Sequence, residues 1–174
     1  LQKDPAQRYR AGAELAADLT RVHQALRAVQ SGMDDEERFA VLRRLRFFHD
    51  FSHAEIREVM RAGCWVECQA GERVLNPADP DDRFYVVVSG AVRMLRDGES
   101  VGRVESGGCF GEATFAEGAR GDAVIEAEGN LTLLKVAASL LEQASVPCQL
   151  RFNKVFLREL IERLQRGPAR AQRG

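Results

Sequence analysis

Three features that mark large classes of proteins are scarce in the sequence: long apolar runs, an excess of charge of one sign, and histidine. No apolar run approaches the roughly 20 residues that a membrane-spanning helix needs, and the first residues lack the apolar core of a signal peptide. The net charge of -1 argues against an extensive nucleic-acid-binding surface. We therefore expect a cytoplasmic protein with neither a membrane nor a nucleic acid as its partner.

Histidine is absent from residues 64–136, the part of the chain in which β-strands are predicted below. The three histidines are His23, His49 and His53. Rolled β-domains that act as metalloenzymes use two or three inward-facing histidines, so no metal site is expected, and no Ser/His/Asp or Cys/His catalytic arrangement is indicated. The cysteines also lack zinc-type spacing and are expected to be buried thiols. They are Cys64, Cys68, Cys109 and Cys148.

The length and composition fit one folded domain with additional elements, since the chain has 174 residues of which 45% are hydrophobic. Residues 1–63 and 137–166 show helical spacing, and residues 64–136 show short β runs. We expect a terminal helical segment over 1–30, the main domain over 31–166 and a disordered tail over 167–174. Apolar residues at helical spacing form one stripe on the first segment. They are Leu15, Leu19, Val22, Leu26 and Val29.

Two capping patterns precede the β-rich part. Asp34 to Glu37 predicts a helix with acidic residues in its first turn and Arg43, Arg44 and Arg46 in its last, as the helix dipole favours. Ser52 and Glu55 repeat the capping pattern before a second helix. We interpret these charges as helix-end charges and not as binding patches.

Short β runs separated by glycine turns follow, and Asp97-Gly98 is a strong signal for a two-residue hairpin. Seven strands are predicted, at 64–68, 73–75, 84–89, 91–96, 100–104, 123–127 and 131–136. This spacing favours a rolled antiparallel sheet. The fold class is therefore α+β: an antiparallel, jelly-roll-like β-roll with flanking N- and C-terminal helices.

The run from Gly107 to Ala127 is the candidate functional segment. Its glycines leave the backbone without side chains, and residues able to begin a short helix follow. The first N–H groups of a helix lack partners and carry partial positive charge, so they favour an anion. The carboxylate of Glu112 beside them is suited to accept hydrogen bonds from sugar hydroxyls. The segment is typical of a phosphate-binding turn between two strands.

Several of these residues together resemble the cyclic nucleotide-binding domain family. The resemblance covers about residues 39–165 and is carried by Gly63, by Gly71-Glu72, by the run 84–90 and by the run 107–112. It implies an eight-stranded β-roll with helices at both ends that move when a cyclic nucleotide occupies the segment. In the family, the residues matching Gly111 and Glu112 bind the phosphate through backbone N–H groups and the ribose 2′-hydroxyl through the carboxylate.

After Glu112 the sequence departs from the pattern of the family that it resembles. The family's arginine position falls on Gly121, its alanine on Ala123 and its threonine or serine on Val124, while the nearest guanidinium is Arg120. Asp122 adds a negative charge. One charge-assisted hydrogen bond is worth about 1.5–3 kcal/mol, so its loss would weaken binding by about one to two orders of magnitude. The expected binding residues are Phe110, Gly111, Glu112, Ala113, Thr114, Arg120, Gly121, Ala123 and Val124.

Three interpretations remain open from the sequence. Arg120 reaches the phosphate and the domain binds a cyclic nucleotide weakly, with cAMP favoured over cGMP because Val124 lacks a hydroxyl for a guanine-like base. Alternatively, the roll is degenerate, binds no ligand, and acts through protein contacts or dimerisation. Thirdly, it binds a different small anionic ligand.

The N-terminus carries a second resemblance, to the last helical segment of a bacterial serine/threonine protein kinase. Leu1 to Tyr9 and Ala13 to Leu19 carry it, and in that family the arginine matching Arg8 is a structural ion-pair partner of the catalytic core. The other kinase motifs are missing, so we expect this chain to be a regulatory piece of a longer kinase and not itself an enzyme. An ordinary amphipathic helix is the alternative.

Two expectations about partners follow. The kinase catalytic domain of a parent chain is the first expected partner. The apolar stripe of the helix 13–30 needs a cover, and a second copy of the chain, giving a homodimer, is one option. A DNA-binding helix-turn-helix is not expected, because only about eight residues follow Arg166.

Overall fold

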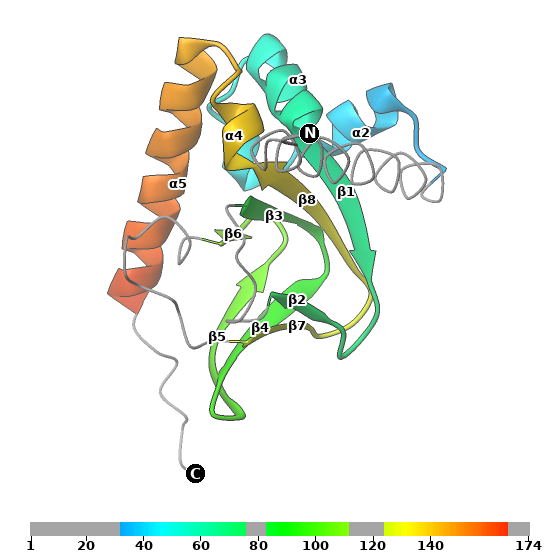
Figure 1. Ribbon diagram of the computed structural model, residues 1–174, viewed down its shortest axis with the longest axis vertical. Helices are drawn as coiled ribbons and strands as arrows, with labels where there is room; N and C mark the ends of the chain where they lie inside the picture. The colour runs from blue at the N-terminus through cyan, green and yellow to red at the C-terminus, as the bar shows by residue number, and fades with distance from the viewer. Residues whose placement is uncertain (1–31, 76–82, 112–123, 167–174) are drawn as a thin grey trace, which may run out of the picture. The chain divides into compact units, whose positions relative to one another are not determined.

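The computed structural model of the protein describes residues 32–75, 83–111 and 124–166 (Figure 1). The chain divides at Asp34/Asp35 into two units, and the helices and strands named below belong to the second. The expected helix over 13–30 and the expected tail over 167–174 lie outside the described residues. No helix in the described ranges is long and apolar enough to cross a membrane.

Two four-stranded antiparallel sheets form the body of the domain, in the orders β1-β8-β3-β6 and β2-β7-β4-β5. The strands are β1 (Gly63–Cys68), β2 (Arg73–Leu75), β3 (Arg83–Ser89), β4 (Ala91–Arg96), β5 (Glu99–Glu105), β6 (Cys109–Phe110), β7 (Val124–Ala127) and β8 (Leu131–Ala137). This arrangement confirms the predicted β-roll with flanking helices.

The helices lie before β1 and after β8 in sequence and cover the β1-β8-β3-β6 sheet (Figure 1). They are α2 (Asp35–Leu42), the 3-10 helix η1 (Arg46–Phe48), α3 (His53–Ala62), α4 (Ala138–Leu141) and α5 (Val146–Arg166). One sheet is therefore buried on both faces, which explains the unbroken apolar run of β3. Alternate side chains of β3 enter two cores: Phe84 and Val86 face the helices, whereas Tyr85 and Val87 face the interior of the roll.

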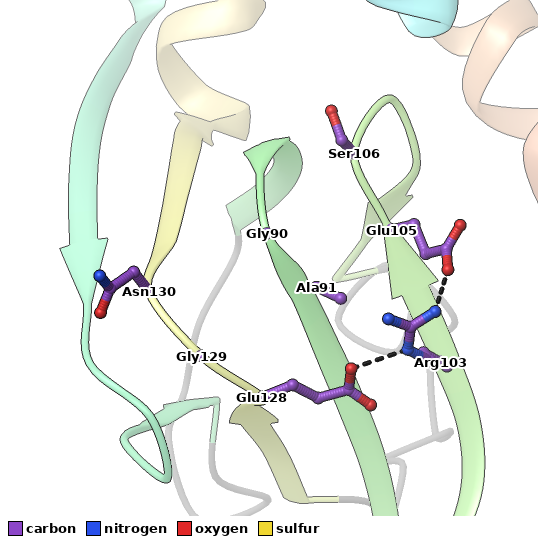
Figure 2. A pocket seen from close by; sticks show the side chains of 8 residues that line it. All are labelled: Gly90, Ala91, Arg103, Glu105, Ser106, Glu128, Gly129 and Asn130. Carbon is purple, nitrogen blue, oxygen red and sulfur yellow. Dashed lines mark hydrogen bonds and ion pairs between the residues drawn. The ribbon is translucent and has the colours of Figure 1, made fainter.

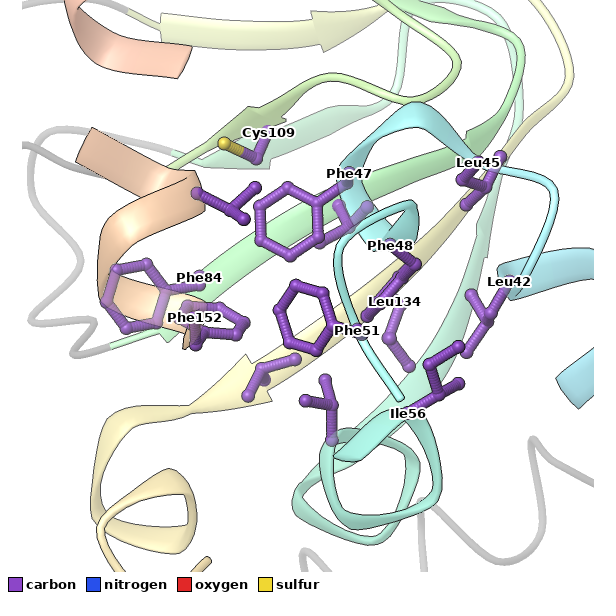
Figure 3. Packing of buried hydrophobic residues seen from close by; sticks show 14 of the residues in the cluster. Leu42, Leu45, Phe47, Phe48, Phe51, Ile56, Phe84, Cys109, Leu134 and Phe152 are labelled. Carbon is purple, nitrogen blue, oxygen red and sulfur yellow. The ribbon is translucent and has the colours of Figure 1, made fainter. Parts of the chain in front are cut away.

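Aromatic side chains hold the helical layer together (Figure 3). Phe47 of η1 packs edge-on against Phe152 of α5 with ring centroids 5.3 Å apart, and Phe152 packs against Phe84 of β3 at 5.0 Å. Cys109 of β6 belongs to the same buried cluster. Helices η1 and α5 and the sheet therefore share one core. Aromatic pairs in this core contribute stability beyond that from the burial of apolar area.

The helix α2 differs from the prediction at its end. Its first turn carries the expected acidic residues, but it ends at Leu42, so Arg43 and Arg44 lie beyond it and Arg46 opens η1. The buried side chains of the stretch explain the break, because they would point around most of the circumference of one straight α-helix. These are Leu42, Leu45, Phe47, Phe48 and Phe51.

Two other local predictions are confirmed. Ser52 and Glu55 form a complete capping box at the start of α3. Asp97 and Gly98 join β4 to β5 with φ angles of 52° and 81°, as a two-residue turn of this kind requires. The sequence prediction missed β6, because its two residues stand between glycines and are too few to show a period.

Candidate functional site

Residues 111–123 of the run 107–127 join the two sheets and are called the candidate segment from here on. Residues 112–123 lie outside the described residues, but both strands that hold its ends are described. Before it, β6 pairs with β3 through Tyr85↔Phe110 and Val86↔Cys109. After it, β7 lies between β2 and β4 in the other sheet. A ligand held by this segment would therefore contact the place where the chain passes from one sheet to the other.

Gly111 begins the segment and cannot be replaced without strain. Its φ is +104°, and a Cβ atom there would lie 2.4 Å from the carbonyl oxygen of Arg83 and 3.3 Å from the Cα of Phe84. The backbone thus approaches β3 more closely than any side chain allows. This glycine is required by the packing of β6 on β3, whatever its role toward a ligand.

The two glycines before β6 are also fixed by packing. A Cβ on Gly108 would lie 2.6 Å from Cγ1 of Val104, and one on Gly107, whose φ is +83°, would lie 3.3 Å from the backbone nitrogen of Arg46. Gly107 donates its N–H to the carbonyl of Val87 at 2.8 Å. The turn between β5 and β6 is therefore closely packed between β3 and η1.

Of the predicted binding residues, Phe110, Gly111 and Val124 are described, whereas Glu112, Ala113, Thr114, Arg120, Gly121 and Ala123 lie outside the described residues. Phe110 is 0% exposed and stacks on Tyr85, with ring centroids 4.9 Å apart and planes at 4°. Its ring forms part of the interior of the roll.

Val124 opens β7 opposite Leu95. It is half-buried and lies on the face of the strand opposite to Ile125 and Ala127, which face the interior of the roll. Glu126 shares that face with Val124 and forms an ion pair with Arg73 at 3.5 Å. One of the carboxylates near the candidate segment is thus already neutralised.

A separate groove of about 500 Å³ lies at the turns that join β3 to β4 and β7 to β8 (Figure 2). It is lined by Gly90, Ala91, Arg103, Glu105, Ser106, Glu128, Gly129 and Asn130. Its guanidinium, on Arg103, bonds Glu128 at 2.7 Å and also pairs with Glu105 (Figure 2). With two carboxylates on one cation the groove is not arranged for a phosphate, and it shares no residue with the predicted site.

In the described ranges, four ion pairs tie α5 to the residues that precede the roll. Arg46 bonds Glu159 at 2.5 Å and lies 3.4 Å from Glu162. The other two pairs are Arg151–Glu55 at 3.2 Å and Arg158–Asp50 at 2.8 Å. Sequence reasoning missed these partners, because each pair joins residues far apart in the chain and no local pattern links them.

Two of the carboxyl groups in these pairs, those of Asp50 and Glu55, have a lowered pKa. The hydrogen bond from Arg158 and its charge lower the pKa of Asp50. Burial acts to raise the pKa of Glu55, but hydrogen bonds from Ser52 and Arg151 outweigh it, so this pKa is lowered as well. Both groups are therefore held in the charged form that the ion pairs need.

The cysteines and histidines form no metal site in the part of the chain that the structure describes. None of the four cysteines forms a disulfide: Cys68, Cys109 and Cys148 are buried as expected, while Cys64 is half-buried. Burial, with the nearby carboxylates of Glu58 and Glu55, raises the pKa of Cys148 to about 11. That thiol is protonated at neutral pH.

Comparison with known proteins assigns the fold. Residues 65–145 match the family model of the cyclic nucleotide-binding domain, and this range includes the candidate segment and both strands that hold it. Over this range the chain is similar to a cyclic nucleotide-binding domain. A cyclic nucleotide-binding domain from Methylobacillus flagellatus KT has the same fold, with a TM-score of 0.63, 20% identity and coverage of 74% of this chain and 76% of that one.

Two further matches are to regulatory subunits of protein kinases from other organisms. The chain is 34% identical over 65 residues to a cAMP-dependent protein kinase regulatory subunit of Yarrowia lipolytica, a match that covers 37% of this chain and 17% of that protein. The regulatory subunit of a cAMP-independent protein kinase A from Trypanosoma brucei superposes with a TM-score of 0.60 at 19% identity, covering 71% of this chain and 46% of that one. A triple variant of the trypanosome subunit, in which one substitution replaces threonine by arginine, has cAMP bound in its A site.

Proposed function

We propose that this cyclic nucleotide-binding domain binds a cyclic nucleotide weakly at the segment between β6 and β7, and that occupancy changes the position of the flanking helices. The family match over residues 65–145, which includes this segment, carries the proposal. The closely packed start at Gly111 supports it, because a fixed backbone presents its N–H groups in one direction.

In this proposal, the backbone after Gly111 binds the phosphate, and Glu112 accepts hydrogen bonds from the ribose. Arg120 takes the place of the arginine that the family has at the position of Gly121. A guanidinium one residue away reaches the phosphate only with a local rearrangement, which makes the affinity low. We expect cAMP to be favoured over cGMP, because Val124 brings no hydroxyl to a guanine-like base.

The contacts of α5 support the coupling to helix movement. Outside its apolar contacts, α5 is held by ion pairs, and in one of them, Arg158–Asp50, both side chains are more than two-fifths exposed. An exposed ion pair contributes little free energy, so a change at the site can release it. The moving helices would then alter the activity of a kinase catalytic domain in a longer parent chain, in line with the N-terminal resemblance and the regulatory-subunit relative.

Calorimetric titration with cAMP and cGMP tests the binding step. We expect saturable heat with cAMP, weaker binding of cGMP, and a loss of about tenfold or more in affinity for Arg120→Ala, as for one charge-assisted hydrogen bond. Arg96→Ala removes the same charge from the β4–β5 hairpin and is the matched control. If millimolar cAMP gives no heat, or if Arg96→Ala loses as much as Arg120→Ala, the proposed site is wrong.

A second candidate function keeps the fold without cyclic-nucleotide binding, so that the roll acts through protein contacts or a different small anionic ligand. Gly121 and Asp122 favour it, because they replace a cation by a neutral residue and an acidic one. The trypanosome regulatory subunit, which has the same fold, belongs to a cAMP-independent protein kinase A. Under this candidate the wild-type chain binds no cAMP, and Gly121→Arg with Asp122→Ala gains measurable affinity in the same calorimeter.

A further inference from the structure

The 3-10 helix η1 lies between the turn that leads into the candidate segment and the C-terminal helix α5. Its backbone contacts that turn, because a Cβ on Gly107 would lie 3.3 Å from the nitrogen of Arg46 and 3.4 Å from its Cβ. Gly107 places no side chain between its backbone and that of Arg46, and its φ of +83° is one that glycine adopts readily. A shift of the turn toward η1 would therefore displace the backbone of Arg46.

The side chain of Arg46 extends from the same residue to α5. Its guanidinium bonds Glu159 at 2.5 Å and lies 3.4 Å from Glu162, one turn further along the helix. The side chain of Glu159 is 6% exposed, whereas that of Arg46 is 48% exposed. A buried carboxylate needs its cation, so the position of Glu159 depends on that of Arg46.

Apolar contacts follow the same route. The ring of Phe47, the next residue of η1, packs on Phe152 of α5, and Cys109 of β6 lies in the same buried cluster (Figure 3). Close-packed interiors transmit displacements rather than absorb them. One residue, Arg46, therefore contacts the β5–β6 turn with its backbone and α5 with its charge.

We propose that Arg46 is a positioning residue that couples the turn before the candidate segment to α5. The inference rests on the proposed function, in which occupancy of that segment moves the flanking helices, and it names the residue through which the movement passes. Displacement of Gly107 moves the backbone of Arg46, and the guanidinium moves Glu159 and Glu162 with it. Coupling of this kind is reciprocal, so a change at α5 also reaches the turn.

Hydrogen–deuterium exchange without any ligand tests this link separately from cyclic-nucleotide binding. In Arg46→Gln we expect amide exchange to rise on the order of tenfold in residues 154–162 of α5 and also in residues 105–111, the size expected for loss of one charged hydrogen bond. Arg46→Lys keeps the charge and restores most of the protection. Should Arg46→Gln prove too unstable, Glu159→Gln leaves no buried charge and tests the same link from α5.

Arg158→Gln is the matched control. It breaks an ion pair between α5 and the residues before α3, and its arginine is about as exposed as Arg46, at 43% against 48%. Its partner Asp50 lies beyond η1, and no atom of Asp50 is among the nearest neighbours of Gly107. We expect faster exchange near Arg158 and unchanged exchange in 105–111. The coupling is refuted if residues 105–111 exchange at the wild-type rate in both Arg46→Gln and Glu159→Gln, or if Arg158→Gln accelerates them equally. Failure of cAMP to bind would leave this result untouched.

Discussion

Replacement of Gly111 by alanine is expected to destabilise the domain even when no ligand is present. The added Cβ would lie 2.4 Å from the carbonyl oxygen of Arg83, and the φ of +104° is one that side chains rarely adopt. Backbone strain of this kind costs about 1–3 kcal/mol. Forcing one more methyl group into a packed site costs about 1–3 kcal/mol as well. The free energy of unfolding should therefore fall by about 2–6 kcal/mol in Gly111→Ala.

A second glycine separates these two contributions. Gly71 has a φ of +77°, but nothing lies within 4 Å of a Cβ there. In Gly71→Ala we expect only the loss due to backbone strain, about 1–3 kcal/mol. Urea denaturation of the wild type and both variants measures the difference, and melting temperatures should follow at about 2–4 °C per kcal/mol. Equal losses in the two variants would refute the argument that Gly111 is held by its contact with β3.

Three further predictions concern residues outside the candidate segment. Alkylation of the native protein at neutral pH should modify Cys64 before Cys148, since Cys64 is half-buried and burial raises the pKa of Cys148 to about 11; mass spectrometry showing the reverse order would contradict this. Because the pKa of Glu55 is lowered in the folded state, its stabilising effect is present above the ordinary carboxyl pKa of 4.5 and is lost as the pH falls through the lowered value. In Glu55→Gln the free energy of unfolding should therefore fall less steeply with decreasing pH below 4.5 than in the wild type. If denaturation curves show the same pH dependence for both proteins, the prediction is wrong. Ser52→Ala should cost about 1 kcal/mol through loss of the α3 cap, whereas Ser52→Asp should retain most of the stability, and equal losses would show that the cap hydrogen bond is unimportant.

Much of the fold follows from local sequence patterns. The Asp97-Gly98 turn and the capping box at Ser52 are decided by residues within a few positions of each other. The strands of the roll can also be predicted from local patterns. For example, β3 is long and apolar enough to be recognised even though both of its faces are buried. Local propensity and tertiary structure agree at these places.

The sequence was least informative where the structure depends on distant contacts. The end of α2 at Leu42 is set by the need to bury Phe47 and Phe48 in a core shared with α5, which no short window contains. The partner of Arg46 is a carboxylate more than a hundred positions away. In the run 107–127, the sequence alone indicates that Gly107 and Gly111 leave the backbone accessible to a phosphate. Their packing against Arg46 and Arg83 gives each a structural reason to be glycine.

That second reason bears on the ligand. Glycines at these positions are expected in this fold whether or not a cyclic nucleotide binds, so they support the domain assignment more strongly than the ligand. In our proposal, the residues that separate binding from non-binding are Arg120, Gly121 and Asp122, where the sequence departs from the pattern that the resemblance implies.

The affinity for cAMP, measured by calorimetry on the wild-type chain beside Arg120→Ala and Arg96→Ala, tests the central proposal most directly. The proposal predicts saturable binding that is weakened about tenfold or more in Arg120→Ala and is unchanged in Arg96→Ala. A wild-type chain that gives no heat at millimolar cAMP, yet binds it once Gly121→Arg and Asp122→Ala are introduced, would contradict the proposal and establish the roll as a cyclic nucleotide-binding domain that has lost its ligand.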